Sequence, residues 1–199
     1  MTLPLQERAE LHVSVSQIKT FLLCPHRYFM RYVRGVPPES RALPLVFGSA
    51  IHEALAAFYV ALQADLEPDP EQIVTIFTDA FDAECKGDLP LVEDEAALGE
   101  AKDKGVALVQ LFQEQIERPH KVLAVEQPFI LDLVDARSGL LVEEQFTGVI
   151  DAIIEMHGQR VLVEHKTAAR KWPQDQLEND LQVSAYLAAS PAHCLRLQC

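Results

Sequence analysis

The sequence predicts a mixed α/β fold: a helical N-terminal half, followed by a small mixed sheet flanked by helices. Apolar residues recur at helical spacing in the first half, whereas strand patterns begin only after about residue 120, and one more helical pattern follows them. This order is typical of helices packed on a small sheet. The 199 residues suit one domain, residues 1–199, with a helical part at about 14–117 and the sheet and last helix at about 122–189.

The helical elements begin with a short helix for which Ser16 is the expected N-cap. Pro25 suits the first turn of a second helix, which ends near Val33. In the next helix, Ile51, Leu55, Phe58 and Leu62 form an apolar stripe. Longer helices are expected at about 47–62, 71–84 and 93–117.

Three strands follow, and then a helix. The strands are expected at about 122–133, 143–156 and 160–167, and the helix at about 175–189. Residues 195–199 alternate apolar and polar side chains. This tail is either a short fourth strand or an irregular end where a longer chain was cut.

The net charge of −13 argues against a generic nucleic-acid binder. Much of it belongs to residues 65–103, which hold thirteen of the thirty Asp and Glu residues and two Lys or Arg. Basic residues cluster elsewhere, so a phosphate-bearing substrate is not excluded: Arg27, Arg31, Arg34 and Arg41, and then Lys166, Arg170 and Lys171. The N-terminus lacks a signal-peptide pattern and no run of eighteen apolar residues exists, so we expect a cytoplasmic protein without a membrane partner.

A hairpin in the second half carries three charged residues among apolar ones. A tight turn at Gly158-Gln159 would pair Asp151 with Lys166 and place Glu164 diagonal to Asp151. Because side chains alternate with period 2, all three would share one face. The surrounding residues, Val149, Ile150, Ile153, Ile154 and 161–163, are typical of strands buried on both faces. Charges converging there are costly unless they bind something, although a structural ion pair is the alternative.

These residue types suit phosphodiester hydrolysis. Carboxylates such as Asp151 and Glu164 offer hard oxygen ligands to Mg²⁺ or Mn²⁺, which polarises phosphate and lowers the pKa of water. A neighbouring lysine, here Lys166, can orient or deprotonate the water or stabilise developing negative charge. His52 would suit Mn²⁺ as a further ligand, although a lone helical histidine is more often a packing residue.

Other candidates are weaker on their own. Gln182 and Tyr186 are four residues apart in the last helix and therefore share a face, where they could hold DNA phosphates or the lysine. Taken alone, the pair is better explained by core-edge or surface positions. Glu126, in the first strand, is a further carboxylate that could face the same cavity, on a poor signal.

Taken in order, these pieces resemble the PD-(D/E)XK nuclease superfamily, specifically its RecB-like exonuclease branch. The resemblance spans about residues 12–189. It is carried by five elements, each weak alone: Ser14 to Tyr28, Gly48-Ser49-Ala50-Ile51-His52 (GxxxH), Gly148-Val149-Ile150-Asp151, Glu164-His165-Lys166 (ExK) and Gln182-Val183-Ser184-Ala185-Tyr186 (QxxxY).

The resemblance implies a restriction-endonuclease-like core and a metal-dependent DNA exonuclease acting in repair, recombination or phage-related processing. It implies that His52, Asp151, Glu164 and the main-chain carbonyl of His165 hold Mg²⁺ or Mn²⁺, that Lys166 is catalytic, and that Gln182 and Tyr186 support the site and contact DNA. DNA, as single strands or duplex ends, is the implied partner, with a helicase or another repair or recombination subunit beside it.

Some relatives bind a [4Fe–4S] cluster through one early and three late cysteines. Cys24 matches the early position, but only Cys194 and Cys199 lie late and Cys85 is misplaced, so we expect no cluster and a buried, apolar Cys24. The family core also continues beyond the QxxxY helix, whereas this chain stops soon after it. The competing functions are a catalytically inactive DNA-binding or scaffolding module of the same fold and an unrelated metal-dependent phosphohydrolase of small nucleotides.

Overall fold

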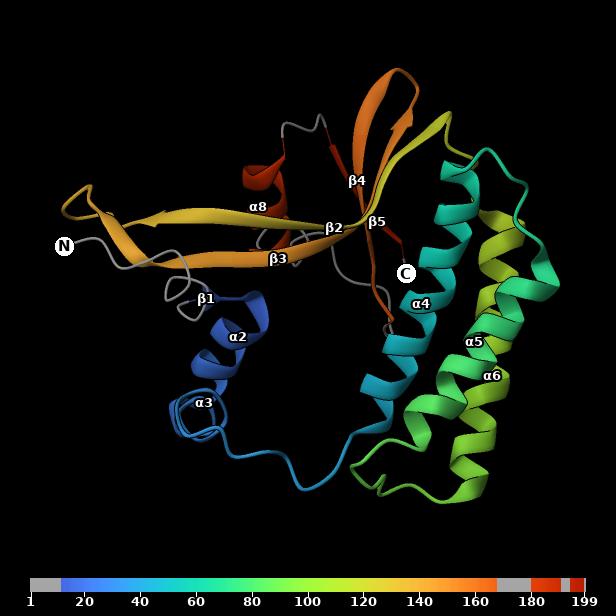
Figure 1. The fold of residues 1–199 in the computed structure, drawn as a ribbon, viewed down its shortest axis with the longest axis horizontal. Coiled ribbons are helices and arrows are strands. Elements are labelled where there is room, and N and C mark those ends of the chain that lie inside the picture. Colours follow the sequence, from blue (N-terminus) through green and yellow to red (C-terminus); the bar gives the residue numbers. More distant parts are fainter. Residues whose placement is uncertain (1–11, 168–179, 191–193, 199) are drawn as a thin grey trace.

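The computed structural model describes residues 12–167, 180–190 and 194–198. It has the predicted mixed α/β architecture, with a helical N-terminal half and a mixed sheet in the C-terminal half (Figure 1). The helices are α2 (Val15–Leu23), α3 (Pro25–Tyr28), the π-helix η1 (Phe29–Val33), α4 (Leu43–Gln63), α5 (Pro70–Cys85), α6 (Glu95–Gln115) and α8 (Leu181–Ala189). The strands are β1 (His12–Val13), β2 (Lys121–Val134), β3 (Leu141–Met156), β4 (Gln159–His165) and β5 (Cys194–Gln198).

The first helix begins two residues earlier than the sequence predicts. Ser14, not Ser16, is the N-cap of α2, and its hydroxyl accepts a hydrogen bond of 3.3 Å from the N–H of Gln17. The cause is β1, which pairs with β3 and holds Ser14 in an extended conformation immediately before the helix. The chain therefore leaves a strand and enters α2 without a loop.

Cys24 does not behave as the buried apolar residue that the sequence predicts. It is half-buried, and its Sγ accepts a hydrogen bond of 3.4 Å from the N–H of Arg27. This contact makes Cys24 the N-cap of α3, with Pro25 in the first turn as expected. Capping of α3 therefore explains the position of Cys24 in the chain.

Helix α4 is the central helix of the fold. It begins at Leu43, four residues before the predicted start, and is long and apolar enough to cross a membrane by length and composition. Val46, Ala50, Ala54 and Phe58 are nevertheless fully buried in the core, against α5, α6 and the sheet. Packing within this domain therefore accounts for much of the apolar character of α4.

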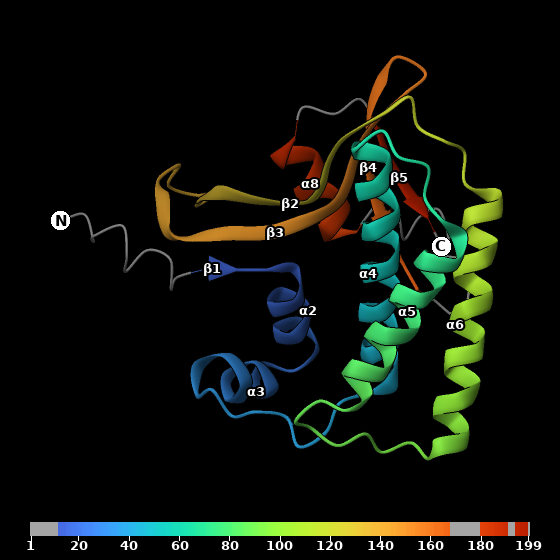
Figure 2. The same cartoon turned by 45° about the vertical axis from the view of Figure 1, so that its right-hand side comes forward.

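The sheet is covered on both faces where it carries the candidate site. Ala152, Ile154, Val161 and Val163 belong to the main core beneath α4, whereas Leu162 belongs to a small second cluster with Tyr186 of α8. Alternate residues of β4 thus face two helical layers. Figures 1 and 2 show these layers, α4 with α5 and α6, and α8, at separate places around the sheet.

One residue departs from the prediction that these strands are buried on both faces. Val149 is 42% exposed, because the β2–β3 pair extends beyond the layer of α4 to α6 (Figure 1).

Strand β3 is the centre of the sheet. It pairs antiparallel with β2 along most of its length, antiparallel with β4 near its end, and parallel with β1 near its start. After α8 the chain returns as β5, which lies parallel to β4. The alternating tail is therefore a strand, the first of the two possibilities that the sequence left open.

The β3–β4 turn differs from the predicted one by one position. His157 and Gly158 form the turn, both with positive φ (51° and 73°), and Met156 pairs with Gln159. Positive φ at both central residues matches the right-handed twist of the flanking strands, and histidine tolerates this conformation better than most residues. The register is thus shifted by two residues: Ile153 pairs with Leu162 rather than with Glu164. Continued by one residue beyond its last pair, it sets Asp151 opposite Glu164, not Lys166.

Candidate active site

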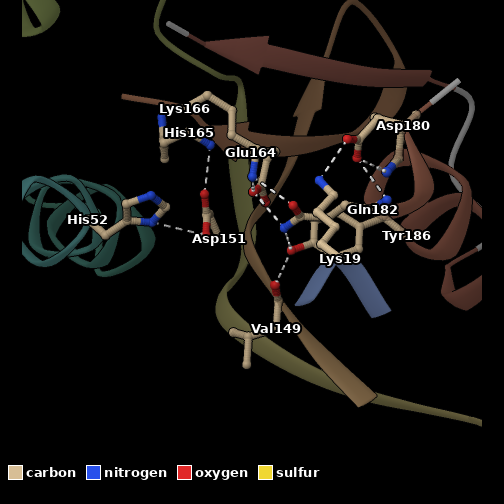
Figure 3. A network of polar contacts seen from close by, with 11 residues as sticks. Lys19, His52, Val149, Asp151, Glu164, His165, Lys166, Asp180, Gln182 and Tyr186 are labelled. Carbon is tan, nitrogen blue, oxygen red and sulfur yellow. Dashed lines mark hydrogen bonds and ion pairs between the residues drawn. The ribbon is translucent and has the colours of Figure 1, made fainter. Parts of the chain in front are cut away.

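Asp151 lies at the centre of the candidate site and joins two elements that are distant in sequence. Its Oδ2 accepts a hydrogen bond of 2.7 Å from the main-chain N–H of His165 on β4 (Figure 3). Its Oδ1 lies 3.3 Å from Nδ1 of His52 on α4. The carboxylate is buried, with 8% of the residue exposed. Asp151 therefore connects the helical layer to the strand that carries the ExK residues.

The electrostatics of this pair favour a charged Asp151. Burial opposes ionisation, but the hydrogen bond and charge of His52, together with the His165 N–H, lower the pKa of Asp151 below its ordinary value. The hydrogen bond to Asp151 likewise raises the pKa of His52 against the effect of its own burial. The pair is thus an anion with a basic imidazole beside it.

Glu126 joins these two residues, although it was only a weak candidate in the sequence. Ligand atoms of His52, Glu126 and Asp151 all lie within 4.8 Å of one another. Glu126 has a φ of 48°, in the left-handed region, and falls across from Asp151 between paired residues of β2. Burial, and next the charge of Asp151, raise the pKa of its carboxyl. No spacing in the sequence reveals this backbone irregularity, because it depends on how β2 pairs with β3.

Glu164 and Lys166 form the second part of the site together with α8. Nζ of Lys166 forms an ion pair with Oε1 of Glu164 and donates a hydrogen bond of 2.7 Å to Oε1 of Gln182. Nε2 of Gln182 donates to Oε1 of Glu164 at 2.7 Å and to Oη of Tyr186 at 2.6 Å. The hydroxyl of Tyr186 donates in turn to the carbonyl of Val149 at 2.5 Å. The predicted face shared by Gln182 and Tyr186 is thus directed at the ExK residues (Figure 3).

Burial shapes the acid–base properties of this second part. Burial, and next the nearby charge of Asp151, raise the pKa of Glu164. Burial also raises the pKa of Tyr186, so its hydroxyl is a donor at neutral pH. Oε2 of Glu164 is buried and has no hydrogen-bond partner among the described residues. One carboxylate oxygen is therefore held by Lys166 and Gln182, and the other is a buried acceptor without a partner in the described residues.

His165, between the two charged residues of ExK, has its side chain in the core. Its ring lies 5.6 Å from that of Tyr59 and 5.7 Å from that of Phe112, and 6.2 Å from that of His52. Burial lowers its pKa to about 4, so the imidazole is neutral at physiological pH. The side chain thus helps to pack β4 on the helical layer, and its main-chain N–H positions Asp151.

Helix α8 is itself held in place by an N-terminal contact. Asp180 is its N-cap and accepts hydrogen bonds from the N–H groups of Gln182 at 2.8 Å and Val183 at 3.4 Å. Its other carboxylate oxygen forms an ion pair of 2.9 Å with Nζ of Lys19 on α2. No pattern in the sequence singles out Lys19 or Asp180, whose contact spans 161 positions.

The structure therefore brings the predicted site residues into one region, but their contacts group them differently from the predicted register. Asp151 contacts His52 and the N–H of His165, and Glu126 lies with the first two. Lys166 contacts Glu164, not Asp151 as the predicted register required. In Figure 3, Asp151 lies between His52 and Glu164.

Comparison with known families gives the same assignment as this geometry. The family model described as the PD-(D/E)XK nuclease superfamily matches residues 12–196, nearly the whole chain and all the residues of the site. A search of the curated proteins found no match. The matched region contains both the helical half and the mixed sheet, so fold and site are covered together. The chain belongs to the PD-(D/E)XK nuclease superfamily.

Proposed function

We propose that this protein is a Mg²⁺- or Mn²⁺-dependent DNA exonuclease that hydrolyses phosphodiester bonds. The observation that carries the proposal is the meeting of two groups of side chains, which centre on Asp151 of β3 and Glu164 of the adjacent β4. One is a set of ligand atoms from His52, Glu126 and Asp151 within 4.8 Å of one another. The other is Glu164 with Lys166 held against it. Membership of a nuclease superfamily implies a nucleic-acid substrate.

The residues present fit a divalent cation. Two carboxylates and an imidazole converge, and the buried Oε2 of Glu164 has no partner within the described ranges. Oxygen ligands suit Mg²⁺, and an imidazole among them suits Mn²⁺. We assign His52, Asp151 and Glu164 as ligands, with Glu126 and the carbonyl of His165 beside them. When bound, the ion supplies charge neutralisation at the phosphate and lowers the pKa of water.

Lys166 is the residue that we assign to the reaction itself. Its ammonium group is held by Glu164 and Gln182, next to the ligand set. A cation fixed there can orient the attacking water and stabilise the negative charge that develops on the phosphate oxygens. Because Gln182 is held by Tyr186, and Tyr186 by Val149, the ammonium group is positioned through three successive hydrogen bonds. Gln182 and Tyr186 are thus positioning residues, and we propose that they also contact DNA.

The finer assignment, to the RecB-like branch, is supported by the elements that carry its motifs. His52 of the GxxxH element lies on α4, and the QxxxY residues lie on α8 directed at Glu164 and Lys166. We infer from this branch an exonuclease acting in DNA repair, recombination or phage-related processing in the cytoplasm, with a helicase or another repair subunit as partner.

A cleavage assay tests the proposal. We expect linear end-labelled DNA to be degraded with Mn²⁺ or Mg²⁺ and to remain intact with EDTA, and circular DNA to resist. Asp151→Asn and Lys166→Gln should each lower the rate by at least about a hundredfold. Asp132→Asn is the matched control, because Asp132 is an exposed carboxylate on β2 that contacts only the side chain of Gln145 among the described residues.

Thermal unfolding with Mn²⁺ separates the roles. A saturating ion stabilises the protein by about 2.7 kcal/mol at a hundred times its Kd. Asp151→Asn should abolish this shift, whereas Lys166→Gln should retain it. Wild-type protein that binds DNA and Mn²⁺ without cleaving would instead be an inactive DNA-binding module. Hydrolysis of small nucleotides but not DNA would favour the phosphohydrolase.

A further inference from the structure

A basic segment with aromatic side chains lies outside the site described above. Residues 12–36 hold four Lys or Arg residues and no Asp or Glu, in a protein of net charge −13. They form β1, α2, α3 and η1. We call the following six residues the arginine–aromatic surface: Phe21, Arg27, Tyr28, Arg31, Tyr32 and Arg34.

The aromatic rings of this surface form a continuous row. The ring centres of Phe21 and Tyr28 are 5.5 Å apart, and those of Tyr28 and Tyr32 are 5.3 Å apart. The guanidinium carbon of Arg31 lies 5.3 Å from the centre of the Tyr32 ring, in a cation–π contact. Phe21, at one end of the row, is 49% exposed. The row thus extends across α2, α3 and η1 and brings the three aromatic rings together with the guanidinium group of Arg31.

The cations of this surface lack acidic partners among the residues that the structure describes. Arg27, Arg31 and Arg34 are exposed, and none forms an ion pair or a side-chain hydrogen bond within 12–167 and 180–190. Two other arginines are paired: Arg41 with Glu84, and Arg118 with Glu67. Three unpaired guanidinium groups at spacings of four and three residues follow one another about a helical turn apart. No described residue therefore competes with an anion for them.

The arginine–aromatic surface is joined to the candidate active site. Lys19, on the same helix as Phe21, forms an ion pair with Asp180, which caps the helix that carries Gln182. At the other end of α2, β1 pairs with β3. Both views show α2 and α3 beside the β2–β3 pair, on the side of α4 away from α5 and α6 (Figures 1 and 2). A polymer bound on this surface would thus continue toward the site.

We propose that the arginine–aromatic surface binds single-stranded DNA, with phosphates at Arg27, Arg31 and Arg34 and unpaired bases stacked on the row of rings. This combination of unpaired cations and π-faces is what sequence-tolerant recognition of single strands requires. The proposal rests on the proposed function, because it gives the nuclease the single-stranded part of its substrate. Its test measures binding without cleavage, so the two can fail separately.

Charge complementarity indicates that the ligand of this surface is a polyanion, and the row of rings indicates that this polyanion has exposed aromatic bases. Leu22 and Leu23 are also exposed, so an anionic lipid surface has a related chemistry. A lipid surface would use these leucines, whereas a single strand would use the rings, since a leucine has no π-face on which a base can stack. We therefore favour the single strand, and the test separates the two.

The experiment measures the affinity of the full chain for a fluorescein-labelled oligothymidylate in EDTA, by anisotropy over a series of salt concentrations. The triple variant Arg27→Ala/Arg31→Ala/Arg34→Ala should lower the affinity at least tenfold and reduce the salt slope by about 2, since each phosphate contact contributes about 0.7 for a single strand. The control triple variant, Lys86→Ala/Lys104→Ala/Arg137→Ala, removes three exposed cations that lie outside the segment. It should change the affinity less than twofold.

A second pair of variants tests the stacking. Phe21→Ala should lower the affinity for the oligothymidylate about tenfold, which corresponds to one lost base–aromatic stack. Binding to a blunt duplex should stay unchanged, because its bases are already stacked. The neighbouring Leu22→Ala removes a more exposed apolar side chain, 75% exposed, and should leave the affinity unchanged. Thermal unfolding of each variant checks that the fold is intact.

Two outcomes would overturn the proposal. One is equal loss of affinity in the two triple variants, which would mean that binding follows overall charge. The other is stronger binding of the wild type to anionic vesicles than to the oligothymidylate, with Leu22→Ala lowering it, which would assign the surface to a membrane. If the wild type bound the oligothymidylate through these arginines but did not cleave DNA, the proposed function would be contradicted and this inference would stand.

Discussion

The main-chain N–H of His165 donates a hydrogen bond of 2.7 Å to the side chain of Asp151. This contact fixes the end of β4 to the middle of β3, so Glu164 and Lys166, on either side of His165, are held beside Asp151. A main-chain donor leaves the opposite oxygen of Asp151 to face His52 at 3.3 Å. The hairpin thus positions the carboxylate by its backbone and the lysine by its side-chain contacts.

Glu126 should destabilise the metal-free protein and strengthen its binding of Mn²⁺. Burial and the charge of Asp151 raise the pKa of its carboxyl, so its ionised form destabilises the metal-free fold above that pKa. We expect Glu126→Gln to stabilise the metal-free protein by less than about 1 kcal/mol, because a half-exposed charge is screened by solvent. The same variant should weaken Mn²⁺ binding about tenfold.

Calorimetric titration with Mn²⁺ and chemical unfolding measure these two effects. Glu143→Gln, at an exposed position of β3, serves as the control and should change neither. A Glu126→Gln protein with unaltered Mn²⁺ affinity would show that Glu126 is not a ligand.

Tyr186→Phe should weaken the contacts that position Lys166. The substitution removes the donor of the 2.5 Å hydrogen bond to the Val149 carbonyl and the acceptor for Nε2 of Gln182. Leaving buried polar groups unsatisfied costs about 1–2 kcal/mol of unfolding free energy, and kcat should fall several-fold with KM little changed. Urea unfolding and steady-state cleavage measure both.

The Lys19–Asp180 pair predicts a pH-dependent stability. Burial opposes ionisation of Asp180, but the hydrogen bond from Lys19 and those from the first N–H groups of α8 lower its pKa overall. A depressed carboxyl pKa stabilises the fold above the ordinary pKa of about 4, and this contribution is lost as the pH falls through the folded value.

Asp180→Asn keeps an N-cap and removes the charge. We expect it to cost up to about 1 kcal/mol at pH 7 and almost nothing near pH 2, in urea unfolding at both values. Lys19→Gln should give the same pH profile. A cost of Asp180→Asn that is equal at the two pH values would show that capping alone is involved.

Two glycines of α6 should respond in opposite directions to alanine. A Cβ at Gly105 would lie 1.9 Å from Cζ of Phe77, which is fully buried, so Gly105→Ala should destabilise the protein by about 1–3 kcal/mol. A Cβ at Gly99 meets no atom within 4 Å, so Gly99→Ala should stabilise by up to about 1 kcal/mol through helix propensity. Thermal or urea unfolding measures both, and a stable Gly105→Ala protein would contradict the close packing of α5 on α6.

The sequence predicted the fold class and most elements because local patterns dictate them. The helix predicted at 71–84 is α5, Pro70–Cys85, and the strand predicted at 143–156 is β3, Leu141–Met156. Alternation along the strands depends only on residue parity, and a two-residue turn shifted by one position changes the register by two. The parity of Asp151 and Glu164 therefore survived the wrong position of the turn.

Residue order alone thus determined the class of fold and the superfamily, and it singled out most of the residues that the structure brings together. Tertiary structure decided how they are grouped: His52 and Glu126 with Asp151, and Lys166 with Glu164 and Gln182. It also placed Lys19 against Asp180, 161 positions away. The physical reason is that these contacts depend on the left-handed turn at His157, the irregularity at Glu126 and the docking of α8. The irregularity at Glu126 and the docking of α8 are set by packing between distant segments, which no local pattern in the chain records.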